Sequence, residues 1–215
     1  MFRGNDLQFI LVYLPIILLS LTFHEIAHGF AAYKLGDLTA KNDGRLSLNP
    51  IRHIDPIGLI VLLVARIGWA KPVMINPNNL ENPKKDMAII SLAGPLTNLL
   101  LSVLFFIPWF ILNSMESPPN MPAYFYALIE AGVYLNVVLA VFNLLPIPPL
   151  DGSKIIGSLL PDHLYYKIVH NSRIGMLVLI ILVFTGVFSQ IIFPMVSSVI
   201  KLYEYAAGGI IKLFF

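Results

Sequence analysis

Two histidines lie four positions apart in the stretch LTFHEIAHGFAA, residues 21–32. On a helix His24 and His28 lie one turn apart on one face, so both imidazoles can bind a single zinc ion. Glu25 follows His24 directly, and its carboxylate can act as a general base toward a water on that metal. The flanking residues are apolar, and ionisable groups within a membrane helix indicate function by default. The alternative interpretation is a helix end whose polar residues face water.

A catalytic zinc ion usually has three protein ligands, so a third ligand is required from elsewhere in the chain. The candidates outside the first motif are His53, Asp151, His163 and His170. Asp151 lies in the stretch NLLPIPPLDG, residues 143–152, whose prolines exclude a regular helix and hold the carboxylate on a stiff turn. Judged by this local sequence alone, an ordinary turn aspartate is an equally good interpretation.

The elements that position these residues must lie in a membrane. The chain has 215 residues, of which 57% are hydrophobic and 12% are charged, whereas a soluble domain carries about 25% charged residues. This length predicts a single domain covering residues 1–215. A net charge of +2 without a dense Lys/Arg cluster argues against nucleic-acid binding. The absence of cysteine excludes a disulfide framework, a thiolate zinc site and a cysteine nucleophile.

A membrane-spanning helix needs about 20 mostly apolar residues. Four stretches meet this requirement: residues 7–32, 87–112, 122–145 and 174–193. A fifth apolar stretch, residues 57–67, is too short to span and is expected to be re-entrant or interfacial. Residues 69–83 are rich in proline, which predicts an extended edge strand or irregular loop. The predicted fold is an all-α polytopic membrane protein of about four transmembrane helices, with a re-entrant or β-hairpin-like segment on the cytoplasmic side.

The orientation follows from Lys and Arg, which favour cytoplasmic loops. Eight lie between the first two spans: Lys34, Lys41, Arg45, Arg52, Arg66, Lys71, Lys84 and Lys85. Three lie between the third and fourth spans, namely Lys154, Lys167 and Arg173, and three fall on the other side, namely Arg3, Lys201 and Lys212. This division predicts a multi-pass protein of the cell membrane. Its N-terminus would lie outside and the histidine motif toward the cytoplasmic side.

Five motifs together resemble the site-2 protease family of intramembrane zinc metalloproteases. HEIAH and NLLPIPPLDG carry the resemblance, and AGPLTN at residues 93–98 matches a motif of the family's second core helix. GRLSLNPIRHIDPIG at residues 44–58 and GWAKPV at residues 68–73 are similar to the compact bacterial branch. The resemblance covers residues 20–155 and implies a three-helix catalytic core. Many relatives carry a PDZ or CBS domain, for which this chain is expected to have no room.

The resemblance also implies the site and its reaction. One Zn²⁺ per chain would be held by His24, His28 and Asp151, with Glu25 as base. Asn143 would assist at the substrate carbonyl. The expected reaction is hydrolysis of a peptide bond in a transmembrane segment, or in a signal-peptide remnant, of another membrane protein within the lipid bilayer. Residues 69–83 could pair with an unwound substrate as an edge strand.

Several points stay open at this stage. Asn98 either caps a helix break next to Gly94 or reaches the site, whereas Asn136 is expected to pack or to support a ligand. His53 and Asp55 are expected to stabilise their loop, and Glu130 to make a structural hydrogen bond. The alternative functions are a zinc transporter, a non-proteolytic protein that binds membrane helices, and a metalloprotease acting on soluble peptides or lipidated tails. The substrate and the oligomeric state are not predicted.

Overall fold

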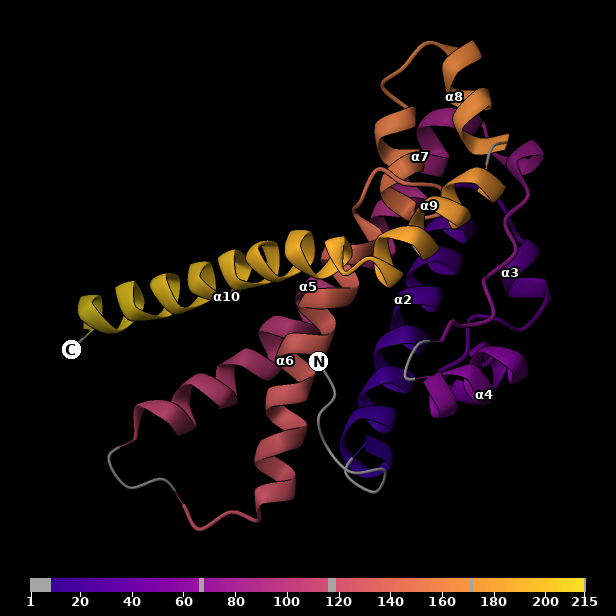
Figure 1. The fold of residues 1–215 in the computed structure, drawn as a ribbon. Coiled ribbons are helices and arrows are strands. Elements are labelled where there is room, and N and C mark those ends of the chain that lie inside the picture. The colour runs from indigo at the N-terminus through magenta and orange to yellow at the C-terminus, as the bar shows by residue number, and fades with distance from the viewer. Residues whose placement is uncertain (1–8, 66–67, 116–118, 171, 215) are drawn as a thin grey trace.

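The fold is built almost entirely from helices. The structure, a computed structural model, describes residues 9–65, 68–115, 119–170 and 172–214. The elements in chain order are η1 (Phe9–Tyr13), α2 (Leu14–Lys34), α3 (Thr39–Asn42), η2 (Pro50–His53), α4 (Pro56–Ala65), η3 (Pro77–Asn79), α5 (Pro83–Ser114), α6 (Ala123–Asn143), α7 (Asp151–Gly157), α8 (Asp162–His170), α9 (Ser172–Phe184) and α10 (Val187–Phe214). This confirms the predicted all-α class (Figure 1).

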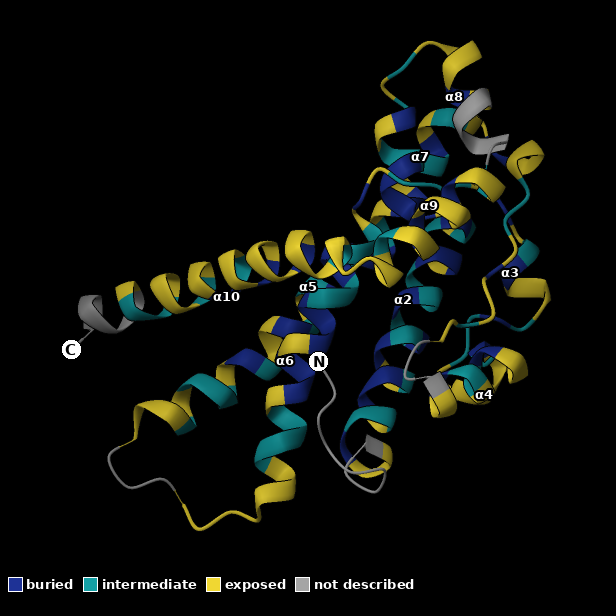
Figure 2. Cartoon of the chain, viewed as in Figure 1, coloured by how far each residue is buried: buried dark blue, intermediate teal, exposed yellow. Residues whose placement is uncertain are grey.

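Among the described residues, three helices are long and apolar enough to cross a membrane: Ile10–Lys34, Pro83–Ser114 and Ala123–Asn143. They pack on one another, α5 against both α2 and α6. Their large apolar side chains are widely exposed on the outside of the bundle, while several fully buried positions are polar: Ser20, Ser91, Asn98, Ser102 and Asn136 (Figure 2). A lipid-facing surface with polar groups enclosed between helices is the arrangement expected in a bilayer, where an exposed polar group is costly.

The stretch expected to form the fourth span, residues 174–193, is not one straight helix. Ser172–Phe184 and Val187–Gly209 meet at an angle of 85° and together form either a broken span or a re-entrant pair. The chain turns at Gly186, whose φ of +76° lies in the left-handed region that favours glycine. A hydropathy average predicts one continuous span here because it depends only on residue type and not on the direction of the backbone.

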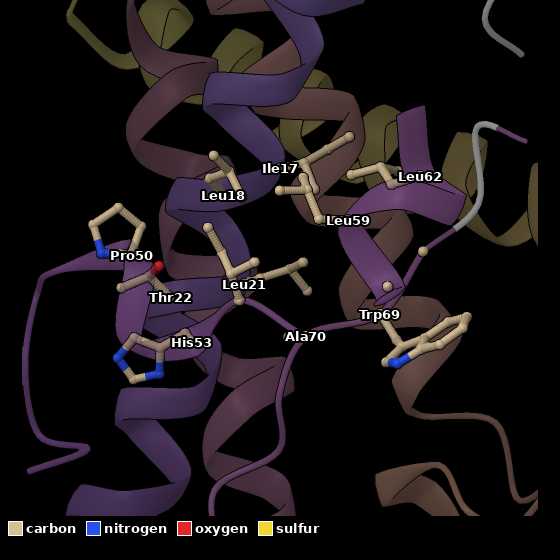
Figure 3. A pocket seen from close by; sticks show the side chains of 13 residues that line it. Ile17, Leu18, Leu21, Thr22, Pro50, His53, Leu59, Leu62, Trp69 and Ala70 are labelled. Atoms are coloured by element: carbon tan, nitrogen blue, oxygen red, sulfur yellow. The ribbon is translucent and has the colours of Figure 1, made fainter. Parts of the chain in front are cut away.

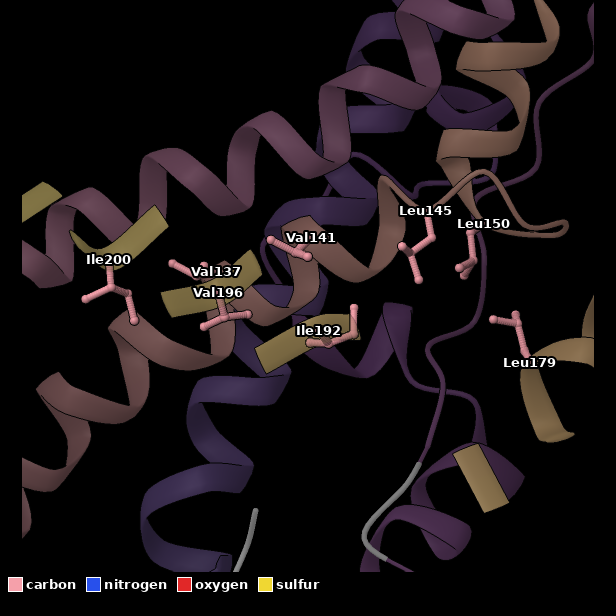
Figure 4. Close-up of a cluster of buried hydrophobic side chains, with 8 residues drawn as sticks. All are labelled: Val137, Val141, Leu145, Leu150, Leu179, Ile192, Val196 and Ile200. Carbon is pink, nitrogen blue, oxygen red and sulfur yellow. The ribbon is translucent and has the colours of Figure 1, made fainter. Parts of the chain in front are cut away.

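Helix α10 extends sideways from the bundle and crosses α6 (Figure 1). Its inner face joins α6, α9 and the loop before α7 in one apolar cluster, made of Val137, Val141, Leu145, Leu150, Leu179, Ile192, Val196 and Ile200 (Figure 4). Farther along α10, the Tyr203 hydroxyl is 2.9 Å from the Ser102 hydroxyl, and its ring lies 5.4 Å from that of Phe106. These contacts attach the C-terminal helix to α5 and α6.

The short apolar stretch after the first span forms α4, a helix of ten residues that is too short to span. The Asp55 carboxylate accepts a hydrogen bond from the Gly58 N–H at 2.8 Å at the start of this helix. An antiparallel bridge between Ile54 and Ala70 joins the chain before and after α4. The segment is therefore a helical excursion closed by one bridge, with residues 66 and 67 outside the described part of the chain.

Candidate metal centre

Three potential metal ligands converge between α2, α5 and α7. His24 and His28 project from α2, and Asp151 is the first residue of α7. The two imidazole Nε2 atoms are 2.9 Å apart, and Asp151 Oδ2 lies 3.3 Å from that of His24 and 3.1 Å from that of His28. All three residues are buried, with exposed fractions of 5%, 7% and 7%. Among the described residues this is the group of His and acidic side chains that could hold a metal ion.

The proline-rich turn delivers Asp151 from a distant part of the sequence. Helix α6 ends at Asn143, and α7 begins at Asp151 after an extended Leu150. Gly152 permits a close return, because a Cβ there would lie 2.2 Å from the carbonyl oxygen of Leu144. Burial alone would raise the pKa of the Asp151 carboxyl, but its contacts with the two histidines and the Lys154 ammonium prevail and hold the pKa below its usual range. The group is therefore an anionic ligand at neutral pH.

Hydrogen bonds on the far side of each imidazole fix its proton. His24 Nδ1 is 2.6 Å from Asn98 Oδ1, and His28 Nδ1 is 2.7 Å from the Ile90 carbonyl oxygen. Both partners are acceptors, so each histidine donates from Nδ1 and its Nε2 atom is directed to the cluster. Two such atoms and a carboxylate oxygen at this separation require a proton or a cation between them.

The orientation of the Asn98 amide is itself determined by its neighbours. Its nitrogen donates to Asn136 Oδ1 at 3.0 Å and to the Ser20 carbonyl at 3.3 Å. Asn136 in turn donates to the Gly132 carbonyl at 2.8 Å. Helix α5 is continuous through residue 98, so Asn98 does not cap a helix break and instead supports His24. Asn136 supports Asn98 rather than serving only to pack α6.

The spacing of the three ligand atoms fits zinc. For a tetrahedral ion with ligands at about 2.0 Å, neighbouring ligand atoms are about 3.3 Å apart. The observed separations of 2.9, 3.1 and 3.3 Å lie at or slightly below that value. Two neutral imidazoles and one carboxylate are also a ligand set that zinc enzymes use, with a fourth position left for water or substrate.

Glu25 lies beside the cluster and contacts a segment far away in sequence. Its Oε2 atom accepts a hydrogen bond of 2.8 Å from the N–H of Val73. Val73 lies in residues 71–76, which form no helix and run as an open chain to an extended Asn76. The expectation that this proline-rich stretch is extended agrees with this geometry, although one bridge at Ala70 is its only pairing among the described residues.

Other candidate residues lie outside the cluster. His53 is buried but hydrogen-bonds the Ser47 carbonyl at 2.8 Å within its own loop, and with the cap made by Asp55 this supports the loop role. His163 and Glu130 are exposed. The side chain of His170 lies outside the described residues. Asn143 donates from Nδ2 to the Leu139 carbonyl at 2.9 Å, one turn earlier in α6.

Gly94 is a site residue whose role the sequence did not reveal. A Cβ at this position of α5 would lie 2.5 Å from His28 Nε2 and 2.6 Å from His24 Cε1. Ordinary contact begins near 3.4 Å, so the absence of a side chain lets α5 approach both imidazoles. The AGPLTN motif marks Gly94 and Asn98, but their targets on α2 become visible only in the folded chain.

A buried His–His–Asp group, with both histidines on a spanning helix, defines a membrane-embedded metalloenzyme, and comparisons with known proteins identify its kind. The sequence model of Peptidase family M50 matches residues 119–187. The chain is 40% identical over 197 residues to "Putative zinc metalloprotease YwhC" of Bacillus subtilis, covering 87% of this chain and 89% of that protein. It is 31% identical over 219 residues to "Putative zinc metalloprotease Rip2" of Mycolicibacterium smegmatis, covering 95% and 82%.

A third relative, "Putative zinc metalloprotease MJ0611" of Methanocaldococcus jannaschii, is 31% identical over 137 residues, covering 62% of this chain and 63% of that protein. No solved structure matches the chain. The chain belongs to Peptidase family M50 and is a zinc metalloprotease. This confirms the family resemblance, the enzyme class and the zinc cofactor predicted from the sequence.

Proposed function

We propose that residues 1–215 form one intramembrane endopeptidase domain, which hydrolyses a peptide bond in a transmembrane segment or signal-peptide remnant of another membrane protein. The observation that carries this proposal is the burial of the His24, His28 and Asp151 group between apolar helices long enough to cross a membrane. A substrate bond must enter the bilayer region to reach ligands in that position.

In this proposal His24, His28 and Asp151 hold the zinc ion. A zinc ion held by these residues would supply Lewis acidity toward the scissile carbonyl and the attacking water. Glu25 accepts the proton of the attacking water and transfers it to the leaving amine. The N–H of Val73 occupies Glu25 Oε2 and leaves Oε1 for this proton. Asn143 has a second amide N–H beyond the one bonded to Leu139, and this N–H would stabilise the developing oxyanion.

Residues 71–76 are the proposed binding edge for an unwound substrate. In an extended chain the N–H groups of successive residues point to opposite sides. The N–H of Val73 points to Glu25, and in an extended chain the N–H and C=O of Met74 would face the opposite side, where a substrate strand would pair with them. Met74→Pro would remove that N–H and should abolish cleavage without loss of zinc. Met74→Ala is the matched control and should stay active.

An apolar cavity borders the same region. It lies between α2, η2, α4 and residues 68–70 and is narrow, with a volume of about 30 Å³ (Figure 3). Leu21 and Thr22 line it within one turn of His24, and Ala70 lines it three residues before Val73. Its size suits a small apolar side chain a few residues from the scissile bond.

The proposed orientation places the N-terminus outside the cell and the zinc site toward the cytoplasm. It is supported by the eleven Lys and Arg residues in the two loops at the α2–α5 and α6–α9 connections, against three elsewhere. Labelling of single cysteines introduced into this cysteine-free chain would test it. A cysteine at exposed Tyr166 should react only from the cytoplasmic side, and one at Tyr124 only from outside.

The decisive experiment compares wild type with Glu25→Gln in proteoliposomes containing model transmembrane substrates. We expect Glu25→Gln to keep its zinc and to lose cleavage by about 10²–10⁴-fold. Retained cleavage would refute the role of Glu25 as base. Zinc flux without any cleavage in wild type would instead support a transporter. Cleavage of the same sequence as a soluble peptide, but not within a bilayer, would refute the intramembrane substrate.

A further inference from the structure

Residues 71–79, which we call the anchored segment, lie against the helix that carries Glu25. The N–H of Val73 donates to Glu25 Oε2 at 2.8 Å. The Val73 side chain is 8% exposed and lies close to Gly29 on the same face of α2, where an added Cβ would be 3.4 Å from Val73 Cγ1. The contact to Glu25 is therefore part of a packed surface.

The anchored segment is held at its first residue by two hydrogen bonds. Lys71 donates its N–H to the His53 carbonyl at 2.9 Å. The Lys71 carbonyl accepts a hydrogen bond from the guanidinium of Arg45, which is buried. A buried charged donor on a carbonyl is among the stronger single hydrogen bonds in proteins.

The other end is held by Asp37, which is 0% exposed. Its Oδ2 atom accepts from the N–H of Asn76 at 2.7 Å, and its Oδ1 atom accepts from the side-chain amide of Asn79 at 2.8 Å. Asp37 lies in the turn three residues after the end of α2, and its own N–H donates to the Ala32 carbonyl at 3.0 Å. Oδ1 also accepts from the hydroxyl and N–H of Thr39, contacts that stay within the local turn.

Val73 is two residues after one anchor and three residues before the other. An extended chain advances about 3.3 Å per residue, so the anchors lie within about 7 and 10 Å of the donor. Such a short span leaves its N–H little freedom to move away from Glu25. Misplacement of a reacting group by about 1 Å can reduce a rate about 10²-fold.

We infer that Asp37 is a positioning residue for the reaction: with Arg45 at the opposite anchor, it fixes the anchored segment so that the N–H of Val73 orients the Glu25 carboxylate. The inference rests on the proposed function, because it assigns Glu25 as the base. Asp37 acts at a distance, through backbone that it shares with the donor, and it touches neither the metal ligands nor the substrate.

The kinetic test uses Asp37→Ala, Asp37→Asn and Thr39→Val. Asp37→Ala removes both contacts to the anchored segment and should lower kcat about 10- to 100-fold with zinc content unchanged, and any accompanying rise in KM reports the proposed substrate edge in residues 71–76. Asp37→Asn keeps one acceptor oxygen and should lie between Asp37→Ala and wild type. Thr39→Val removes a hydrogen bond to the same carboxylate without touching the segment, so it should retain nearly full kcat.

A second readout follows the segment itself. The chain contains no cysteine, and Met74 is 64% exposed, so Met74→Cys accepts a spin label between the two anchors. Asp37→Ala should increase the mobility of that label, and Thr39→Val should not. The double variant Asp37→Ala/Val73→Pro should have a kcat only slightly below that of Val73→Pro alone. Both substitutions act through the same hydrogen bond, from the N–H of Val73 to Glu25.

The positioning role of Asp37 and the proposed function can be refuted separately. Retained cleavage in Glu25→Gln refutes the proposed function. The positioning role of Asp37 then fails too, because Glu25 would not be the base that it helps to orient. If Glu25→Gln is inactive but Asp37→Ala keeps wild-type kcat, changes KM alone, or matches Thr39→Val, the positioning role of Asp37 is refuted and the proposed function stands. If Asp37→Ala does not fold, Asn79→Ala, which removes one contact to Asp37, replaces it with the same expected direction.

Discussion

Replacing Gly94 with alanine would place a methyl group between α5 and the two histidines. The added Cβ would lie 2.5 Å from His28 Nε2 and 2.6 Å from His24 Cε1, against an ordinary contact of about 3.4 Å. To restore ordinary contact, α5 and the imidazole must separate by about 0.9 Å at His28 and by about 0.8 Å at His24. Metal–ligand distances tolerate about 0.2 Å, so the required displacement exceeds that tolerance about fourfold.

We expect zinc affinity to fall by about 100-fold or more in Gly94→Ala, a cost of about 2.8 kcal/mol. The ordinary effect of this substitution in a helix interior is opposite in sign, because alanine is favoured over glycine there by about 0.5–1 kcal/mol. The variant should therefore form its helices normally while failing to hold the metal. This combination separates a steric effect at the site from general loss of folding.

The assay is competition with a chromogenic zinc chelator in detergent micelles, paired with circular dichroism. Gly208→Ala is the matched control, because a Cβ at this position of α10 meets no atom within 4 Å. It should leave zinc affinity unchanged. If Gly94→Ala binds zinc within threefold of wild type, then His24 and His28 do not share a metal ion in the geometry described, and the steric reasoning is wrong.

Three further predictions concern support of the site and of the fold. Asn98→Leu leaves His24 Nδ1 without its acceptor and should weaken zinc binding about 10- to 100-fold in the same chelator assay, whereas Asn113→Ala, on the exposed part of α5, should not. Gly186→Ala meets no neighbour but must adopt a positive φ, so it should destabilise the α9–α10 bend by about 1 kcal/mol in urea unfolding. Burial alone would raise the pKa of Asp37, but the hydrogen bonds that its carboxylate accepts prevail and lower the pKa below the usual 3.8. These hydrogen bonds therefore stabilise the fold fully above that pH. Wild type should lose more thermal stability than Asp37→Asn as the pH falls below about 4.

The parts of the site that depend on local spacing were predictable from the sequence. The separation of His24 and His28 by four residues fixes a shared helix face, and the adjacent position of Glu25 fixes its reach. Asp151 was one of several candidate ligands, because the sequence of a proline-rich turn does not indicate which distant helix its side chains will contact. Its selection came from the family resemblance, and the structure brings its carboxylate within 3.3 Å of both imidazoles.

The parts that depend on tertiary contacts were not predictable. Asn98, Gly94 and Ile90 all lie on α5, and their roles follow from how close that helix comes to α2. Backbone donors and acceptors, such as the N–H of Val73, are present at nearly every residue, so the residue type does not show which of them contact the site. The bend between α9 and α10 was missed for a similar reason, because a window of apolar residues reads the same whether or not the backbone turns at Gly186.

The buried asparagines clarify why a membrane protein would enclose amides beside its metal ligands. An amide in an apolar interior is costly unless its donors and acceptors are paired. Asn98 and Asn136 meet that condition through one another and through the carbonyls of Ser20 and Gly132. Because the oxygen and the nitrogen of both amides have partners, the direction of each amide is determined and the His24 proton is held at Nδ1. The polar core of this bundle therefore orients a ligand across three helices, α6, α5 and α2, which an apolar core of equal packing density could not do.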